Sequence, residues 1–125
     1  MTKRDTIIMT KIQGYQKLLK DSVKEFRIST PSTLSGIHPM MRRGMVQTVG
    51  DIFELTIPLT KETLEKLPLN REIIKQFRNT ASHNYGQITN ELAYACIIHC
   101  VDKPMMNAVK NLLENNDDKK QADQG

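Results

Sequence analysis

The sequence predicts an all-α protein, an up-and-down bundle of four to five helices. Apolar residues recur at steps of three and four along most of the chain, the spacing of one helical face, and almost nothing alternates as a strand does. Of the 125 residues, 38% are hydrophobic but only 5% are aromatic, which favours a helical core of Ile, Leu, Val and Met. A chain of this length should form one domain.

The positions of the helices follow from this spacing and from the breakers between them. Residues 27–39 hold a cluster of Ser, Pro and Gly without periodicity and should form a loop. The segment 115–125, NNDDKKQADQG, lacks large apolar residues and should be frayed or disordered, so the helical domain covers residues 1–114. The expected helices run from about residue 4 to 26, from 38 to 59, from 60 to just before Pro68, from beyond Pro68 into 78–85, from about 88 to 99, and from 104 to about 113.

The charge is mildly basic and unevenly distributed. The net charge is +4, and residues 1–50 hold nine Lys or Arg against three acidic residues. The amino-terminal half could therefore present a basic surface to a phosphate backbone or to an acidic partner. An ordinary solvated face would have the same composition.

Several features favour a cytoplasmic protein without a membrane role. The start of the chain carries charges and no long apolar run, so it does not resemble a secretory signal. No stretch approaches the roughly 20 apolar residues that a membrane-spanning helix needs. The two cysteines, Cys96 and Cys100, lie four residues apart in an expected helix, a spacing that does not indicate a disulfide framework.

No known metal or cofactor motif stands out. Cys96, His99 and Cys100 would share nearly one helical face and could bind zinc, but a fourth ligand is not apparent, so packing is the better interpretation. The chain has no phosphate-binding loop, dinucleotide fingerprint, Ser-His-Asp arrangement or paired carboxylates. We therefore expect chemistry without a metal or a cofactor.

The densest set of potentially catalytic side chains is the segment 78–85, Arg-Asn-Thr-Ala-Ser-His-Asn-Tyr. His83 can take a proton from a ribose 2′-hydroxyl or give one to the leaving 5′-oxygen, because imidazole titrates near neutral pH. Arg78 can offer several donors to the oxygens of a phosphorus on which negative charge grows. The pair suits a ribonuclease that uses the 2′-hydroxyl of RNA as its nucleophile and needs no metal. An isolated Arg-x4-His also arises by chance, and a lone His is more often structural.

A straight helix does not bring these two side chains together. At about 100° per residue, Arg78 and Tyr85 fall on one stripe, whereas His83 points about 140° away from Arg78. Either the helix breaks, or the Arg side chain reaches around, or a second subunit completes the site. Asn84 favours a turn through its side chain and Gly86 tolerates positive φ, so we expect a helix junction at Tyr85–Gly86.

The segment FRNTASHNYG resembles the R-x4-H-x-Y motif of HepT-like toxins of the HEPN superfamily, in which a polar residue follows the Arg. RDTIIMTKIQGYQKLL is similar to the first helix of that family. MVQTVGDIFELTIPL is similar to the second, which commonly has Gly-Glu where this chain has Gly50-Asp51. ITNELAYACIIHCVDKPMMNAVKNLL is similar to the closing helices, so the likeness spans about residues 4–114.

The resemblance implies a HEPN-like bundle and the toxin of a type VII toxin–antitoxin system, a homodimeric, metal-independent endoribonuclease. It implies that Arg78 and His83 are catalytic, that Asn79 supports them, and that Asp51, one methylene shorter than the usual Glu, is a supporting residue. The counterpart of Tyr85 in related systems accepts AMP from a partner, a minimal nucleotidyltransferase of the MNT type, and this silences the toxin. The alternatives are a catalytically inactive HEPN module that binds such a nucleotidyltransferase and a plain structural bundle.

Overall fold

The computed structural model describes the backbone of residues 1–124 and the side chains of residues 1–115. Within that range every regular element is helical, which confirms the all-α class. The expected disorder of residues 115–125 stays a prediction, because the side chains of residues 116–125 lie outside this description. The elements are α1 (Lys3–Glu25), η1 (Pro31–Gly36), α2 (Pro39–Thr56), α3 (Lys61–Leu64), α4 (Arg71–His83), η2 (Tyr85–Gln87), α5 (Asn90–Val101) and α6 (Lys103–Gln124), where η marks a 3₁₀-helix.

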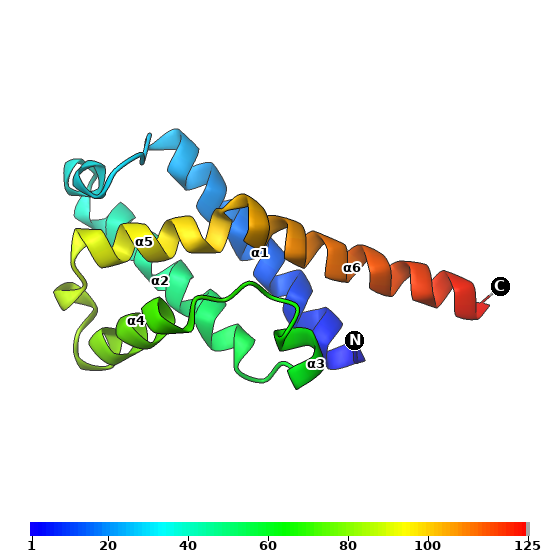
Figure 1. Ribbon diagram of the computed structural model, residues 1–125. Coiled ribbons are helices and arrows are strands. Elements are labelled where there is room, and N and C mark those ends of the chain that lie inside the picture. Colours follow the sequence, from blue (N-terminus) through cyan, green and yellow to red (C-terminus); the bar gives the residue numbers. More distant parts are fainter. Residues whose placement is uncertain (125) are drawn as a thin grey trace.

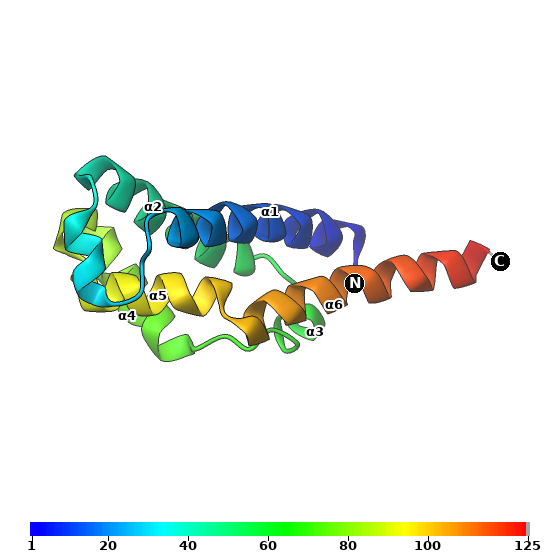
Figure 2. The ribbon, with the colours of Figure 1, turned by 90° about the horizontal axis from the view of Figure 1, so that it is seen from above.

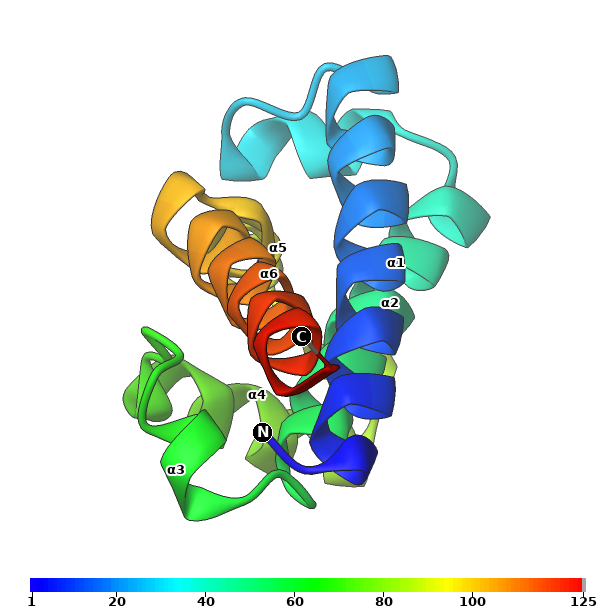
Figure 3. The same ribbon diagram turned by 90° about the vertical axis from the view of Figure 1, so that its right-hand side faces the viewer.

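The long helices alternate in direction up to α5. Helices α1, α2, α4 and α5 run back and forth, whereas α6 continues in nearly the direction of α5 (Figures 1 and 2). In a view along α6 the two helices overlap, beside α1 and α2 (Figure 3). They are separated by Asp102, whose Oδ1 accepts a hydrogen bond from the backbone N–H of Met105 at 2.9 Å. The up-and-down order thus holds for four helices, and α6 departs from it.

Both ends of α1 are closed by local hydrogen bonds. Thr2 Oγ1 accepts from the backbone N–H of Asp5 at 3.0 Å, as an N-cap does. At the other end Arg27 adopts a left-handed conformation with φ of 53°, and the N–H of Ile28 donates to the carbonyl of Val23 at 2.9 Å. This is the geometry of a Schellman motif, with Arg at the position usually held by Gly. The helix therefore stops where the sequence predicted a loop.

The expected loop after α1 is more regular than its breakers indicated. Thr30 and Thr33 form a capping box that starts η1, and Leu34 within it is completely buried. Tyr94 of α5 also donates its hydroxyl to the carbonyl of Ser29 at 2.8 Å. One apolar anchor and one long-range hydrogen bond therefore order this loop, and neither follows from periodicity.

Helix α2 begins as predicted and ends three residues earlier. His38 Nδ1 accepts from the backbone N–H of Met40 at 3.1 Å and so caps its start. The helix ends at Thr56, not at Leu59. Pro58 lacks an N–H and so cannot donate the next hydrogen bond of the helix, which accounts for the earlier end.

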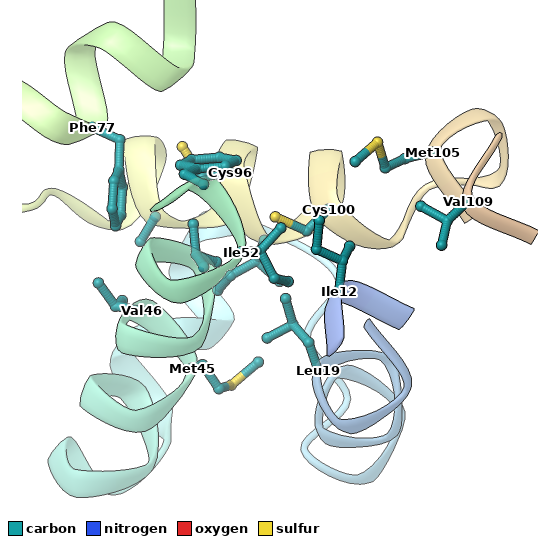
Figure 4. Close-up of a cluster of buried hydrophobic side chains, with 14 of the residues drawn as sticks. Ile12, Leu19, Met45, Val46, Ile52, Phe77, Cys96, Cys100, Met105 and Val109 are labelled. Atoms are coloured by element: carbon teal, nitrogen blue, oxygen red, sulfur yellow. The ribbon is translucent and has the colours of Figure 1, made fainter. Parts of the chain in front are cut away.

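The core lies where α1, α2, α5 and α6 meet, and Figure 4 shows side chains from each of them pointing into it. Ile12, Leu19 and Ile52 are among its fully buried residues. Cys96 and Cys100 pack in the same core. Burial raises the pKa of the Cys96 thiol to about 12 and that of Cys100 further still, so both thiols stay protonated near neutral pH.

A buried carboxylate joins the start of α1 to the start of α3. Asp5 accepts hydrogen bonds from the Thr60 hydroxyl at 2.5 Å, the Thr60 backbone N–H at 3.1 Å and the Thr63 hydroxyl at 2.6 Å. Burial opposes ionisation of Asp5, but these donors outweigh it and place its pKa below the ordinary value of 3.8. The network fixes the chain between α2 and α4 to the first turn of α1.

In the part of the chain that is described, we find no helix with the length and apolar character that a membrane crossing requires.

Replacing Asp5 by Asn should lower the free energy of unfolding by about 2–3 kcal/mol near neutral pH, because charge-assisted hydrogen bonds become neutral ones. The pKa of Asp5 is lowered on folding, so its ionised form favours the folded state above pH 3.8, and this contribution is lost as the pH falls further. Urea unfolding between pH 7 and pH 3 should show a smaller acid-induced loss for Asp5→Asn than for the natural chain. Asp21→Asn, which removes an exposed carboxylate from α1, should leave that loss unchanged; equal behaviour of the two variants would contradict the prediction.

Candidate functional site

Helix α4 carries the predicted site residues, and its start is fixed from two sides. Asn70 Oδ1 accepts from the backbone N–H of Glu72 at 3.1 Å and of Ile73 at 3.2 Å, which caps the helix. The backbone N–H of Asn70 itself donates to His99 Nε2 at 3.0 Å. His99 Nδ1 therefore bears the proton in neutral imidazole, and it lies 3.7 Å from a carboxylate oxygen of Asp102. His99, considered above as a zinc ligand, links α5 to the start of α4.

A chain of aromatic rings holds α4 against the core. Phe77 is the fully buried residue of α4, with 1% of its surface exposed. Its ring packs edge-to-face on Phe53 of α2, with centroids 5.4 Å apart, and on Tyr85, with centroids 6.3 Å apart. Phe77 thereby positions both the helix and the turn that follows it.

The helix junction lies at Asn84, one residue before the predicted Tyr85–Gly86. Asn84 is extended, with φ of −170° and ψ of 120°, and its Oδ1 accepts from the backbone N–H of Gly86 at 2.8 Å. Tyr85–Gln87 then forms the short 3₁₀-helix η2. Gly86 has no positive φ, so the side-chain hydrogen bond of Asn84, and not glycine freedom, makes the turn.

The junction does not bring Arg78 and His83 together. Helix α4 is continuous through His83, so the offset of about 140° between the two side chains remains. The His83 side chain is exposed, and it makes no hydrogen bond or ion pair with any other residue that the structure describes. A helix break between Arg78 and His83, one of the three ways to bring these side chains together, is therefore excluded within one chain.

An open hollow of about 960 Å³ lies beside α4, between that helix, the end of α2 and the segment that joins them. Three predicted residues, Arg78, Asn79 and Tyr85, line it, whereas His83 and Asp51 do not. Its remaining walls include apolar side chains such as Ile57. The hollow therefore combines polar and charged side chains of α4 with apolar side chains from α4 and from the other walls.

Arg78 is paired with Glu54 of α2, a residue that the sequence did not single out. Arg78 Nε lies 3.3 Å from Glu54 Oε1, and about half of each side chain is exposed. Such an exposed pair is weak, so an oxygen of a bound phosphate can take the place of the carboxylate. Glu54 follows Gly50 by one helical turn, which puts both on the face of α2 that lines the hollow. The step of four residues from Gly50 to Glu54 is the sequence signal that could have identified Glu54 as a site residue.

Asp51, the supporting residue that the resemblance implies, does not line the hollow that holds Arg78. It lines a second hollow of about 680 Å³, between α1 and α2, together with Lys11 and Tyr15. No hydrogen bond or ion pair joins Asp51 to Arg78 in the described structure. Glu54 lines both hollows.

Tyr85 fits against α2 because residue 50 is glycine. A Cβ atom at Gly50 would lie 2.8 Å from the Tyr85 hydroxyl oxygen, closer than side-chain atoms tolerate. The Tyr85 side chain is 40% exposed, and its hydroxyl has no hydrogen-bond partner among the described residues. The hydroxyl is thus unpartnered and directed at the α2 backbone.

Fold and geometry together define an all-helical protein in which the exposed Arg78, Asn79 and Tyr85 line one hollow. The exposed His83 lies outside the hollow, at the end of α4. No protein-family model, characterised protein or solved structure matches this chain. The resemblance to HepT-like toxins therefore rests on the motif and helix sequences quoted above.

The effect of Gly50→Ala on the free energy of unfolding should depend on whether residue 85 is Tyr or Phe. In a Tyr85→Phe background, Gly50→Ala should raise the free energy of unfolding by about 1 kcal/mol, because Ala favours a helix over Gly and no hydroxyl obstructs the new methyl group. With Tyr85 present, the clash should cancel that gain. Urea unfolding of the four proteins in a double-mutant cycle measures the difference. An equal effect of Gly50→Ala in both backgrounds would show that the hydroxyl does not occupy this place.

Proposed function

We propose that this protein is a HepT-like toxin of the HEPN superfamily, a metal-independent endoribonuclease of a type VII toxin–antitoxin system in the cytoplasm. The observation that carries the proposal is the placing of Arg78, which is exposed in an open hollow beside Tyr85 and weakly paired. His83 adds an exposed imidazole without a partner among the described residues. The order of Arg78, His83 and Tyr85 matches the R-x4-H-x-Y motif, which the resemblance associates with RNA cleavage.

The reaction is a transfer of the phosphoryl group to the neighbouring 2′-hydroxyl of RNA. A His83 imidazole takes the 2′-hydroxyl proton while the 2′-oxygen bonds to phosphorus and the bond from phosphorus to the 5′-oxygen breaks. A protonated His83 returns a proton to the departing 5′-oxygen. Arg78 leaves Glu54 and donates to the non-bridging oxygens as their negative charge grows. The products are a 2′,3′-cyclic phosphate and a 5′-hydroxyl, and DNA, which lacks the nucleophile, is not cut.

A homodimer supplies the geometry that one chain lacks. Since α4 is continuous from Arg78 to His83, the two side chains of one chain diverge by about 140°. Two copies whose α4 ends face each other would bring both histidines and both arginines to one cleft. The base and the acid then come from different subunits.

Tyr85 gives the site a regulatory switch. A partner nucleotidyltransferase would join the tyrosine oxygen to the α-phosphorus of ATP, pyrophosphate would leave, and the hydroxyl proton would pass to solvent. Because the hydroxyl points at Gly50, the ring must first turn outward. The attached phosphodiester would then lie near Arg78, where its charge and bulk compete with RNA.

One observation favours a second candidate, a helical module that binds the nucleotidyltransferase without cutting RNA. His83 lies outside the hollow that Arg78 lines. If no second copy supplies the missing geometry, the fold retains a surface for the partner and no catalytic site. Binding of the partner without RNA cleavage would favour this candidate over the first.

The first test is cleavage of a labelled single-stranded RNA pool in EDTA. Arg78→Ala should lower the rate by about 10²–10³-fold and His83→Ala by about 10²–10⁴-fold, since each removes a group that acts in the transition state. Gln76→Ala, on the exposed part of α4 outside the hollow, should cut at the natural rate. Cleavage that persists in both site variants would overturn the ribonuclease assignment.

A mixed dimer tests the shared cleft. One natural subunit and one His83→Ala subunit, purified through two different tags, should lose far more than half of the activity, because one histidine cannot serve as base and acid from two sides. Two independent sites would instead leave about half of the activity, which would contradict the shared cleft.

Co-expression with an MNT-type nucleotidyltransferase tests the switch. The intact mass of the chain should rise by whole AMP units, and RNA cleavage should fall with the modified fraction. Tyr85→Phe should show no increase in mass. An increase retained in that variant would place the modification elsewhere.

A further inference from the structure

A line of basic side chains extends from Arg78 toward the start of α4. Arg71, Lys75, Arg78 and Ser82 follow one another at steps of four, three and four, so they share one face of the helix, and all four line the hollow. Seven residues of α-helix separate Arg71 from Arg78, a rise of about 10.5 Å. A stacked nucleic-acid strand advances about 3.4 Å per nucleotide, so this distance matches about three nucleotides.

The two acidic residues that line the hollow leave Arg71 and Lys75 unpaired. Glu54 is paired with Arg78, and Glu65 lies 4.0 Å from Lys61, a residue that does not line the hollow. Arg71 and Lys75 are exposed and form no ion pair or side-chain hydrogen bond with another described residue. Two cations therefore face the hollow with their donors free.

The stability of the helix does not explain Arg71. It occupies the first turn of α4, where the helix dipole favours acidic residues and disfavours cations. Arg71 forms no ion pair with a carboxylate in the described structure, so its position costs the helix a little stability without that compensation. A bound anion would reverse this balance, because it would interact favourably with Arg71 and with the dipole.

We propose that Arg71 and Lys75 bind backbone phosphates of a single-stranded nucleic acid that lies along the hollow, on the side of Arg78 away from His83. This inference deepens the proposed function, because it assigns Arg78 to the reacting phosphate and the other two cations to phosphates that are not cut. Apolar side chains that line the hollow, among them Ile57, Leu67 and Ile74, accommodate the sugars and unpaired bases. These contacts hold the strand without reading its sequence.

The test uses a strand that cannot be cut. Binding of a fluorescein-labelled single-stranded DNA of twelve nucleotides is followed by anisotropy between 50 and 300 mM salt. The slope of log Kobs against log[salt] changes by about 0.7 for each phosphate contact to a single strand. Arg71→Gln/Lys75→Gln should therefore flatten the slope by about 1.4 and weaken binding at low salt, whereas Arg71→Lys should keep the natural slope.

The matched control is Lys17→Gln/Lys20→Gln. It removes the same two charges from exposed positions of α1 that do not line the hollow, and it should leave the slope unchanged. Thermal unfolding checks that each variant is folded. An equal slope for the Arg71/Lys75 variant and the natural chain, or equal flattening in both double variants, would overturn the inference.

Two further outcomes separate this inference from the ribonuclease proposal. If Arg78→Ala stops RNA cleavage while Arg71→Gln/Lys75→Gln changes neither cleavage nor DNA binding, the inference fails and the ribonuclease stands. If the natural chain cuts no RNA but shows the salt dependence described, the ribonuclease proposal fails and the phosphate contacts of Arg71 and Lys75 are supported. A polyglutamate peptide of equal charge that binds as tightly as the DNA, and is weakened by the same variant, would assign the surface to an acidic protein instead.

Discussion

The arrangement of the candidate site depends on the burial of one ring, that of Phe77. This ring is 1% exposed and packs edge-to-face on Phe53 from the core side and on Tyr85 from the outer side. Because it is the residue of α4 that is fully buried, it sets the rotation of that helix about its axis. With Phe77 directed inward, the next residue, Arg78, faces the hollow and reaches Glu54.

The same constraint leaves much of α4 free for charge. Helix α4 has one fully buried residue among thirteen, and three more, Ile73, Ile74 and Ala81, are partly buried against the core. Its remaining positions are open to solvent, to Glu54 or to a ligand. The basic line from Arg71 to Arg78 is possible for this reason. The junction after His83 has a separate cause, the side chain of Asn84, and it returns the chain to the core so that Tyr85 covers Phe77.

Local features were predictable from sequence, and relations between helices were not. The spacing of α1 and the turn at Asn84 depend on residues a few positions apart, so periodicity and turn chemistry were sufficient. The pairing of Arg78 with Glu54, in place of support from Asp51, depends on how α2 and α4 are rotated and shifted against each other. The order of η1 depends on Leu34 reaching the core. No short-range pattern encodes such contacts, and the partner of His83 lies outside the chain altogether in our proposal.

The attachment of α4 through one fully buried ring also affects how easily the segment that carries the candidate site separates from the core. Helix α4 has one fully buried residue, Phe77, and a few partly buried apolar residues packed against the core, whereas α1 and α5 each contribute several fully buried residues. Separation of α4 should therefore cost less than separation of α1 or α5. Local opening free energies follow the amount of buried contact, so α4 and η2 should exchange their amide hydrogens through small fluctuations well below the global unfolding energy. The segment that carries the candidate chemistry is then also the one that can shift to admit a strand or a modifying enzyme without unfolding the rest.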